Sequence, residues 1–151
     1  MADLGGRWFR FPYTASSERD PRVPGAFVAR LLLDVQVSLP GREPIPVRGE
    51  VDTGSPITVL GAHIAPELGL DLEALPDGPP ITLFGVSRRP TRTTVVDLVI
   101  NHLPIAWRGQ VHFALGDPPF RSCSLGTEGF LEYWDLAVFT SERHFSIRSV
   151  L

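Results

Sequence analysis

The sequence predicts an all-β protein, folded as a small β-barrel or a β-sandwich. Three observations support this fold class. The chain contains many short apolar or β-branched runs of strand length. Turn residues separate these runs, with 15 Pro and 14 Gly among 151 residues. Only two segments have the pattern of a helix, and both are short.

The first 26 residues are expected to form an irregular N-terminal arm. Prolines and the polar run ASSERD interrupt this stretch. Its aromatic residues Trp8, Phe9 and Phe11 are expected to attach the arm to the folded domain. That domain is predicted to span residues 27–151.

A hairpin is expected at the start of this domain. Residues 27–39 alternate as a strand does, with Leu33, Val35 and Val37 on one face. The run PGRE is typical of a turn, and residues 44–52 return as a second strand. Two prolines confine the start of that strand to a sheet edge or a bulge.

The middle of the domain is expected to add a strand, a short helix and a second hairpin. Residues 56–60 (PITVL) are β-branched and short, as in a strand. Residues 62–70 fit one or two helical turns that end at Gly69. Residues 81–100 fit two strands around the turn GVSRRP.

The last third is expected to hold strands at 105–115 and 144–151, with a short helix between them. The hydroxyl of Thr127 can cap this helix. The solvent-exposed face of this helix is expected to carry acidic residues, and aromatic residues around the helix are expected to lie in the core. These acidic residues are Glu128, Glu132 and Asp135, and the aromatic core residues are Trp107, Phe130 and Trp134.

Composition and charge exclude several function classes. A net charge of −3 gives no bulk field that would draw the chain to nucleic acid or to an anionic membrane. All basic residues are Arg, which excludes Schiff-base chemistry on a lysine. No run has the length of a transmembrane helix, and the N-terminus lacks the apolar core of a signal peptide. We therefore expect a reduced, cytoplasmic location.

No disulfide, metal or cofactor is expected. Cys123 is the single cysteine and is expected to be a small buried hydrophobe. The histidines lack metal-ligand spacing. They are His63, His102, His112 and His144.

The candidate site lies in the stretch VRGEVDTGSPITVLG, residues 47–61. Asp52 follows an apolar run where the chain must reverse, and Gly54 permits a positive φ or a close approach. Thr53 and Ser55 supply hydroxyls, and backbone N–H groups can point back at the carboxylate. Such a turn fixes a working carboxylate. It also fits an Asx-turn in which Asp52 bonds only its own backbone, and the residues alone leave both interpretations open.

The turn and the segments after it resemble the aspartic proteases, in particular their single-lobed, retropepsin-like branch. Asp-Thr-Gly-Ser follows the apolar Val51 and precedes ITVL. A helix-like piece, a glycine-containing hairpin and further strands come next. The run SLGTEGFL, with Leu125 and Gly126, is similar to the family's apolar-apolar-Gly motif. The resemblance covers residues 27–151 and implies a small closed barrel with one or two short helices.

The resemblance implies an aspartic endopeptidase that cuts a peptide or protein substrate. In this family two carboxylates share one proton and activate a water molecule. This chain holds one such turn, so the resemblance implies a homodimer in which two copies of Asp52 meet on a two-fold axis. Thr53 would bond across the axis, and Gly54 and Ser55 would orient the carboxylates.

The resemblance also assigns a flap and an interface strand. The hairpin within 81–100 would close over substrate. Its flap residues are Phe84, Gly85, Val86 and Ser87. The arginines after them, Arg88, Arg89 and Arg92, are expected to form a solvated turn. The strand at 144–151 would be exposed in a monomer and would pair with a partner.

Some positions differ from the family's pattern. The flap has a single glycine, and Ser124 stands where an apolar residue is expected. Thr127 and Glu128 replace the basic-acidic or basic-amide pair that follows this glycine in viral members and makes a salt bridge at their dimer interface. The alternative function is therefore a non-catalytic dimeric module that binds peptides or assembles. A third possibility is a monomeric barrel in which Asp52 is structural.

Overall fold

The computed structural model describes residues 6–19, 21, 24–25, 27–83 and 85–151. The chain divides into two compact units. The larger unit spans Leu33–Glu132, and the smaller unit combines Met1–Leu32 with Tyr133–Leu151. The flap residue Phe84 and the arm positions 1–5, 20, 22–23 and 26 lie outside the described residues.

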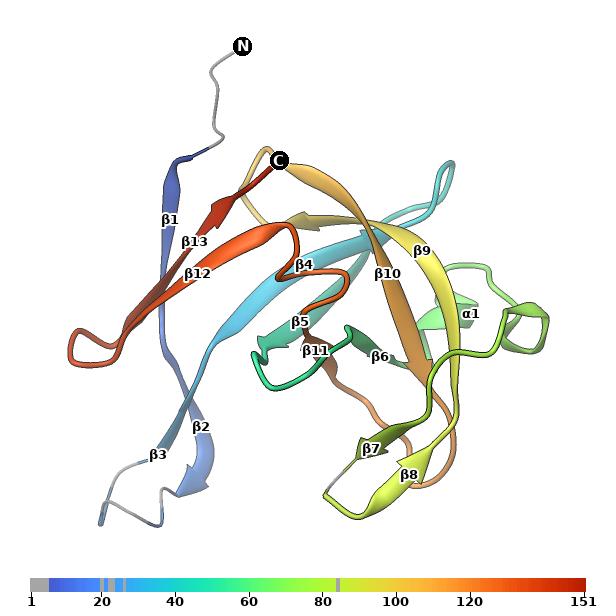
Figure 1. Cartoon of the computed structure of the whole chain (residues 1–151), viewed down its shortest axis with the longest axis horizontal. Helices are drawn as coiled ribbons and strands as arrows, with labels where there is room; N and C mark the ends of the chain where they lie inside the picture. The colour runs from blue at the N-terminus through green and yellow to red at the C-terminus, as the bar shows by residue number, and fades with distance from the viewer. Residues whose placement is uncertain (1–5, 20, 22–23, 26, 84) are drawn as a thin grey trace. The chain divides into compact units, whose positions relative to one another are not determined.

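A closed six-stranded barrel forms the larger unit (Figure 1), with strand order β10-β6-β11-β5-β4-β9. Its strands are β4 (Leu32–Ser38), β5 (Ile45–Val51), β6 (Val59–Gly61), β9 (Thr91–Ile100), β10 (Ala106–Ala114) and β11 (Cys123–Leu125). The long strands β9 and β10 pair antiparallel from Thr91↔Ala114 to Val99↔Ala106. The prediction of a small β-barrel is confirmed.

Side-chain alternation fills the interior of the barrel. On β4, Leu33, Val35 and Val37 are at most 1% exposed, as the sequence predicts. On the opposite face of the same strand, Asp34 is exposed and forms an ion pair with Arg48 at 3.2 Å. Each large apolar side chain buried in this way contributes about 1.5–3 kcal/mol to folding.

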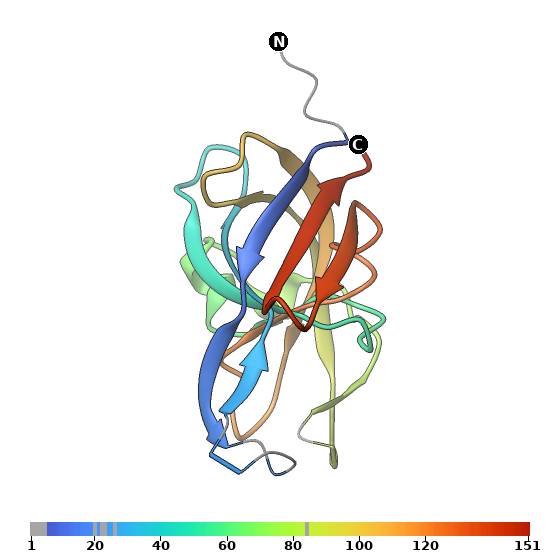
Figure 2. The same cartoon turned by 90° about the vertical axis from the view of Figure 1, so that its left-hand side faces the viewer.

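The smaller unit contains a three-stranded sheet and a two-stranded one. Figure 2 shows β1 (Trp8–Pro12), β13 (His144–Ser149) and β12 (Trp134–Phe139) side by side. The second sheet pairs β2 (Thr14–Arg19) with β3 (Phe27–Arg30). The irregular arm expected at the N-terminus is therefore wrong for Trp8–Arg19. Phe11 stacks on Phe145 at 5.5 Å, and such cross-strand contacts keep β1 extended along β13.

The C-terminal strand β13 is the middle strand of its sheet. β1 pairs with one side of it and β12 with the other. Phe145 and Ile147 are fully buried, and His144 and Ser146 on the opposite face are also buried. The prediction that this strand is exposed in a single chain is wrong, because strands of the same chain use both of its hydrogen-bonding edges.

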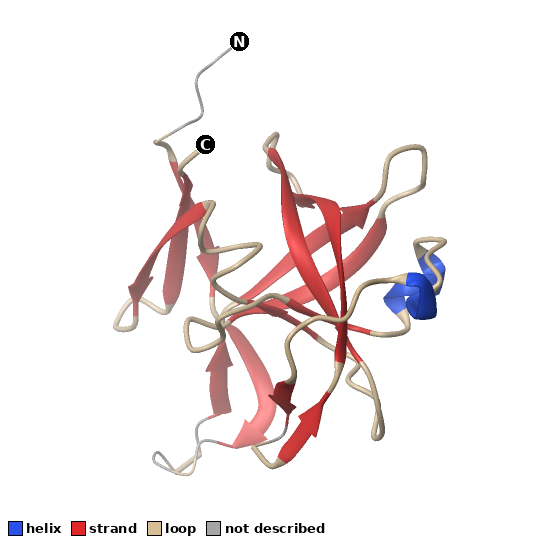
Figure 3. Cartoon of the chain, turned by 45° about the vertical axis from the view of Figure 1, so that its right-hand side comes forward, coloured by secondary structure: helices blue, strands red, loops and turns tan. Residues whose placement is uncertain are grey.

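Helices are short and few in the part of the chain described (Figure 3). α1 (Ile64–Glu67) ends where predicted, with Gly69 at a positive φ of 78°. A 3-10 turn, η1 (Leu72–Ala74), comes next, and the Asp71 side chain accepts from Glu73 N–H at its start. None of the described helices is long and apolar enough to cross a membrane.

The short helix predicted after Thr127 is wrong. Leu131 N–H donates to Gly126 O and Glu132 N–H donates to Thr127 O, so the bonds span five residues rather than four. Gly129 has a positive φ of 90°, which a helix does not accommodate. Residues 127 and 129–133 form turns and Glu128 forms an isolated bridge, so the acidic side chains of this segment have individual partners instead of a common helix face.

Candidate active site

Asp52 lies directly after β5, at the first residue of a turn. Its backbone N–H donates to Leu125 O at 3.0 Å, and Ser55 N–H donates to Asp52 O at 3.2 Å. Gly54 N–H donates to the carboxylate oxygen Oδ1 at 2.9 Å. This last bond is that of an Asx-turn, and it fixes one oxygen of an exposed carboxylate. The same geometry thus fits both interpretations of Asp52. Its carboxylate forms an Asx-turn with the backbone and is still exposed to solvent.

The neighbours of Asp52 in the turn differ in their roles. Thr53 and Gly54 are exposed. The Ser55 hydroxyl donates to Ile57 O at 2.7 Å, so it stabilises the exit of the turn. A contact of Thr53 across a two-fold axis involves a second chain and stays a prediction.

The second motif supports the Asp52 turn from an adjacent strand. β11 lies between β5 and β6, the two strands that enter and leave the turn. It pairs parallel with β5 at Leu125↔Val51 and antiparallel with β6 at Cys123↔Leu60. The fold therefore brings together two sequence motifs that are far apart in the chain.

Gly126 packs closely against the segment that leaves the Asp52 turn. A Cβ atom added there would lie 2.6 Å from Ser55 O and in contact with Ile57 O. Directly after it, Thr127 N–H donates to Ser55 O at 2.9 Å. No larger residue fits this position without movement of the turn backbone, which explains a glycine in the motif.

Sequence reasoning missed Thr58 as a part of this support. Thr58 is fully buried, and its hydroxyl donates to Glu128 O at 2.8 Å and accepts from Gly126 N–H at 3.1 Å. The available signal was one hydroxyl within the apolar run PITVL. A buried hydroxyl in such a run requires partners, and here the second motif supplies them.

Comparison with known proteins identifies the fold. No family model matches the chain, and a search of curated proteins found no match. A solved structure does match: a retropepsin-like aspartic protease from Rickettsia conorii, with a TM-score of 0.61 and 15% sequence identity. The match covers 93% of this chain and 98% of that one. The chain has a retropepsin-like fold.

In this retropepsin-like fold the predicted flap corresponds to a two-stranded hairpin, β7 (Ile81–Leu83) and β8 (Ser87–Arg89). Gly85 has a positive φ of 75° at its tip, and Val86 beside it is 90% exposed. The hairpin projects from the barrel (Figure 1). Its tip is therefore available for contact.

The arginines after the hairpin tip are not all solvated, which corrects the prediction. Arg88 is exposed, but Arg89 is only 4% exposed. Its guanidinium donates to Ser87 Oγ at 2.6 Å and to Pro118 O at 2.7 Å. Arg92 forms an ion pair with Asp77 at 3.1 Å. Both arginines attach the hairpin region to neighbouring loops.

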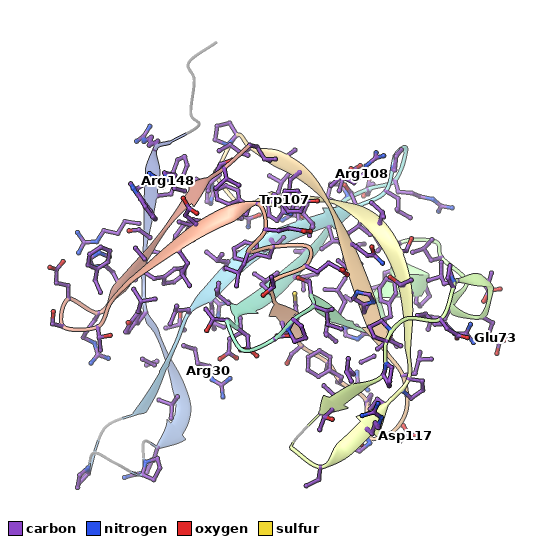
Figure 4. The ribbon with its side chains drawn as sticks, in the orientation of Figure 1. Arg30, Glu73, Trp107, Arg108, Asp117 and Arg148 are labelled. Carbon is purple, nitrogen blue, oxygen red and sulfur yellow. The ribbon has the colours of Figure 1, made fainter. Side chains whose placement is uncertain are left out.

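The other candidates belong to the core of the retropepsin-like barrel. Cys123 is 3% exposed, and burial raises the pKa of its thiol to about 12, so it is not a nucleophile. Trp107 (Figure 4) is buried and donates from Nε1 to Gly129 O at 2.8 Å. Phe130 packs 6.0 Å from its ring. The prediction that these residues are core is confirmed.

The acidic residues after the second motif have specific partners. Glu128 contacts His112 Nε2 at 2.8 Å, and Glu132 accepts from Gly129 N–H at 2.9 Å. Asp135 pairs with Arg148 at 2.6 Å. Among the described residues, no group of three His, Cys, Asp or Glu side chains could hold a metal ion.

Proposed function

We propose that this chain is an aspartic endopeptidase that acts as a homodimer, with Asp52 as its catalytic residue. The observation that carries the proposal is an exposed carboxylate on a rigid turn. Gly54 N–H holds Asp52 Oδ1 at 2.9 Å, and the second motif braces the turn at Gly126. The Rickettsia protein of the same fold is described as an aspartic protease.

The proposed chemistry uses two copies of Asp52 that face each other across a two-fold axis. Two carboxyl groups about 3 Å apart share one proton, because both cannot ionise cheaply. The ionised group takes a proton from a water molecule as the water oxygen bonds to the peptide carbonyl carbon. The protonated group donates to the carbonyl oxygen. The C–N bond then breaks, and the amine leaves with the proton that the first carboxyl group took from water.

The proposed substrate is a peptide in extended conformation. An extended chain offers backbone donors and acceptors on both sides, which suits a site between barrel strands and a β-hairpin. The exposed tip of the β7–β8 hairpin, with Gly85 and Val86, supports its role as a cover over the peptide. A cover of this kind excludes water from the reaction.

The first test is the variant Asp52→Asn. The amide keeps the size of the side chain but cannot take a proton from water, so we expect cleavage of a fluorogenic peptide library to fall by about 10³-fold. Circular dichroism and sedimentation should show an unchanged fold and mass. Asp34→Asn, an exposed carboxylate elsewhere on the barrel, is the matched control and should cut as the parent does.

Cleavage by Asp52→Asn at the parent rate would overturn the assignment. A peptide mimic with a tetrahedral hydroxyl adds a second readout, because it should bind the parent much more tightly than the variant. A parent protein that binds peptides and cuts none would instead support the alternative function, a non-catalytic dimeric module.

A further inference from the structure

A buried histidine contacts the loop that braces the Asp52 turn. His112, on β10, is 2% exposed, and its Nε2 lies 2.8 Å from Glu128 Oε1. Its Nδ1 has no hydrogen-bond partner among the described residues. We therefore assign a proton to Nε2, which faces the Glu128 carboxylate, because a proton on Nδ1 would be buried without an acceptor. His112 then donates to the carboxylate of Glu128.

Glu128 is attached to the segment that leaves the Asp52 turn. Its backbone N–H donates to Pro56 O at 3.0 Å, and its carbonyl accepts from the Thr58 hydroxyl at 2.8 Å. It also forms a parallel bridge with Ile57. Any displacement of Glu128 is thus transmitted to residues 56–58, which begin four residues after Asp52.

His112 is held firmly in place. Its backbone N–H donates to Thr58 O at 3.0 Å, and β10 pairs with β6 at His112↔Val59. A Cβ atom added at Gly78 would lie 2.9 Å from Nδ1, so the ring is packed on that side as well. The imidazole is therefore a fixed donor, whereas the Glu128 side chain is 42% exposed and takes its position from this contact.

We propose that His112 and Glu128 are positioning residues for Asp52. This proposal rests on the proposed function. The 2.8 Å contact joins β10 to the brace, residues 126–129, and the brace holds the turn through Ser55, Pro56 and Thr58. Thr58 and Trp107 also bond the brace through their side chains, but the contact with His112 is the one that holds the Glu128 carboxylate. Without it the brace loses one of its side-chain anchors, and the catalytic carboxylate loses part of its fixed orientation. Misplacement by about 1 Å costs up to about 10²-fold in rate.

Kinetics of four variants test the proposal. Glu128→Ala and His112→Leu should each lower kcat about 10-fold with KM within twofold, because substrate binding is not the affected step. Glu128→Gln keeps an acceptor for Nε2–H and should retain kcat within about twofold. The double variant Glu128→Ala/His112→Leu should lose no more than either single one. As the control, Asp97→Ala removes a carboxylate from the Arg108 ion pair on the same barrel and should leave kcat unchanged.

An activity-independent measurement separates this inference from the proposed function. The amide resonances of Gly54 and Gly126 report on the turn and on the brace, because both N–H groups donate hydrogen bonds there. Both should shift in Glu128→Ala and remain in place in Asp97→Ala. If the parent cuts no peptide, the proposed function fails. The amide resonances of Gly54 and Gly126 then show by themselves whether the His112–Glu128 contact positions the Asp52 turn. An unshifted Gly54 amide resonance in Glu128→Ala would overturn the inference. If the parent is active, a kcat of Glu128→Ala equal to that of the parent would also overturn it.

Discussion

A single glycine controls the contact between the two motifs at the site. Gly126 has no positive φ that demands glycine, so its role is one of space. Backbone carbonyls of Ser55 and Ile57 occupy the volume where a side chain would lie. Carbonyls of a turn cannot retract as a flexible side chain can. The Asp52 turn and the brace are therefore rigid only while this position is glycine.

We expect Gly126→Ala to destabilise the protein by about 1–3 kcal/mol, because overpacking forces the turn backbone to shift. A loss of this size lowers the Tm by about 2–4 °C per kcal/mol in a protein of this length. Thr127→Ala, an exposed neighbour in the same loop, should change stability by less than about 0.5 kcal/mol. Thermal unfolding of both variants measures the difference. Equal stability of the two would contradict the packing argument.

Residues of the site were predictable where local sequence carries the signal. Asp52 stands out because a turn follows an apolar run, and Leu125 and Gly126 stand out through the resemblance of SLGTEGFL to a family motif. Thr58 and His112 do not stand out, because their partners lie elsewhere in the chain. Thr58 bonds a residue 70 positions away, and His112 bonds one 16 positions away. Contacts between residues so far apart in the sequence depend on which strands become neighbours. Hydrophobic periodicity predicts the strands but does not predict how they pair.

At the scale of elements, the β7–β8 hairpin is attached at its base by one buried arginine. Arg89 donates to Ser87 Oγ within the hairpin and to the carbonyls of Leu115 and Pro118 in the loop after β10. A Cβ added at Gly116 would lie 3.1 Å from Arg89 Cδ, so the loop packs closely on the side chain. The Arg89 side chain thereby joins the hairpin to this loop, next to a backbone bond from Leu115 N–H to Pro90 O at 3.1 Å.

The variant Arg89→Met tests this attachment. It keeps a long apolar stem but leaves carbonyls of the 115–118 loop without their donor, which costs about 1–3 kcal/mol. We expect the amide hydrogens of β7 and β8 to exchange at least about 5-fold faster, since about 1 kcal/mol of local stability corresponds to that factor. Arg88→Met, on the exposed side of the same strand, is the control. Unchanged hairpin exchange in Arg89→Met would show that the hairpin is held by other contacts.

Helices and strands were predictable where a single hydrophobic periodicity runs through the whole segment. The strands at β4, β9 and β10 follow alternation, and α1 ends at its glycine. The helix expected after Thr127 fails because Gly129 takes a positive φ and Glu128 bridges to Ile57. The N-terminal arm fails because β1 gains its order from pairing with β13, near the other end of the chain. Tertiary pairing overrides weak local preference in both places.

At the scale of the whole molecule, the chain carries one Asp-Thr-Gly turn in 151 residues. The proposed chemistry needs two, so it needs a second chain. β13 cannot recruit that chain by strand addition, because β1 and β12 already occupy both of its edges. The requirement for two chains is therefore tested best by function, with no assumption about which surface forms the interface.

Mixing parent and Asp52→Asn chains provides that test. If each active site needs Asp52 from both chains, only parent–parent dimers cut. With equal amounts of the two chains and free exchange of protomers, about one quarter of the dimers are parent–parent. The rate per total chain should then fall to about one quarter of the rate of pure parent, because a mixed pair lacks one of the two groups that share the proton.

The reference for this mixture is parent mixed with Asp34→Asn, in which every dimer keeps both copies of Asp52, so its rate should equal that of pure parent. Chains that work alone would give about one half in the Asp52→Asn mixture, since dilution of active monomers is linear rather than quadratic in their fraction. Peptide cleavage is measured after dilution and reconcentration of each mixture, which allows exchange. A linear dependence on parent fraction would rule out the shared site, and a quadratic one requires that each turn contribute half of it.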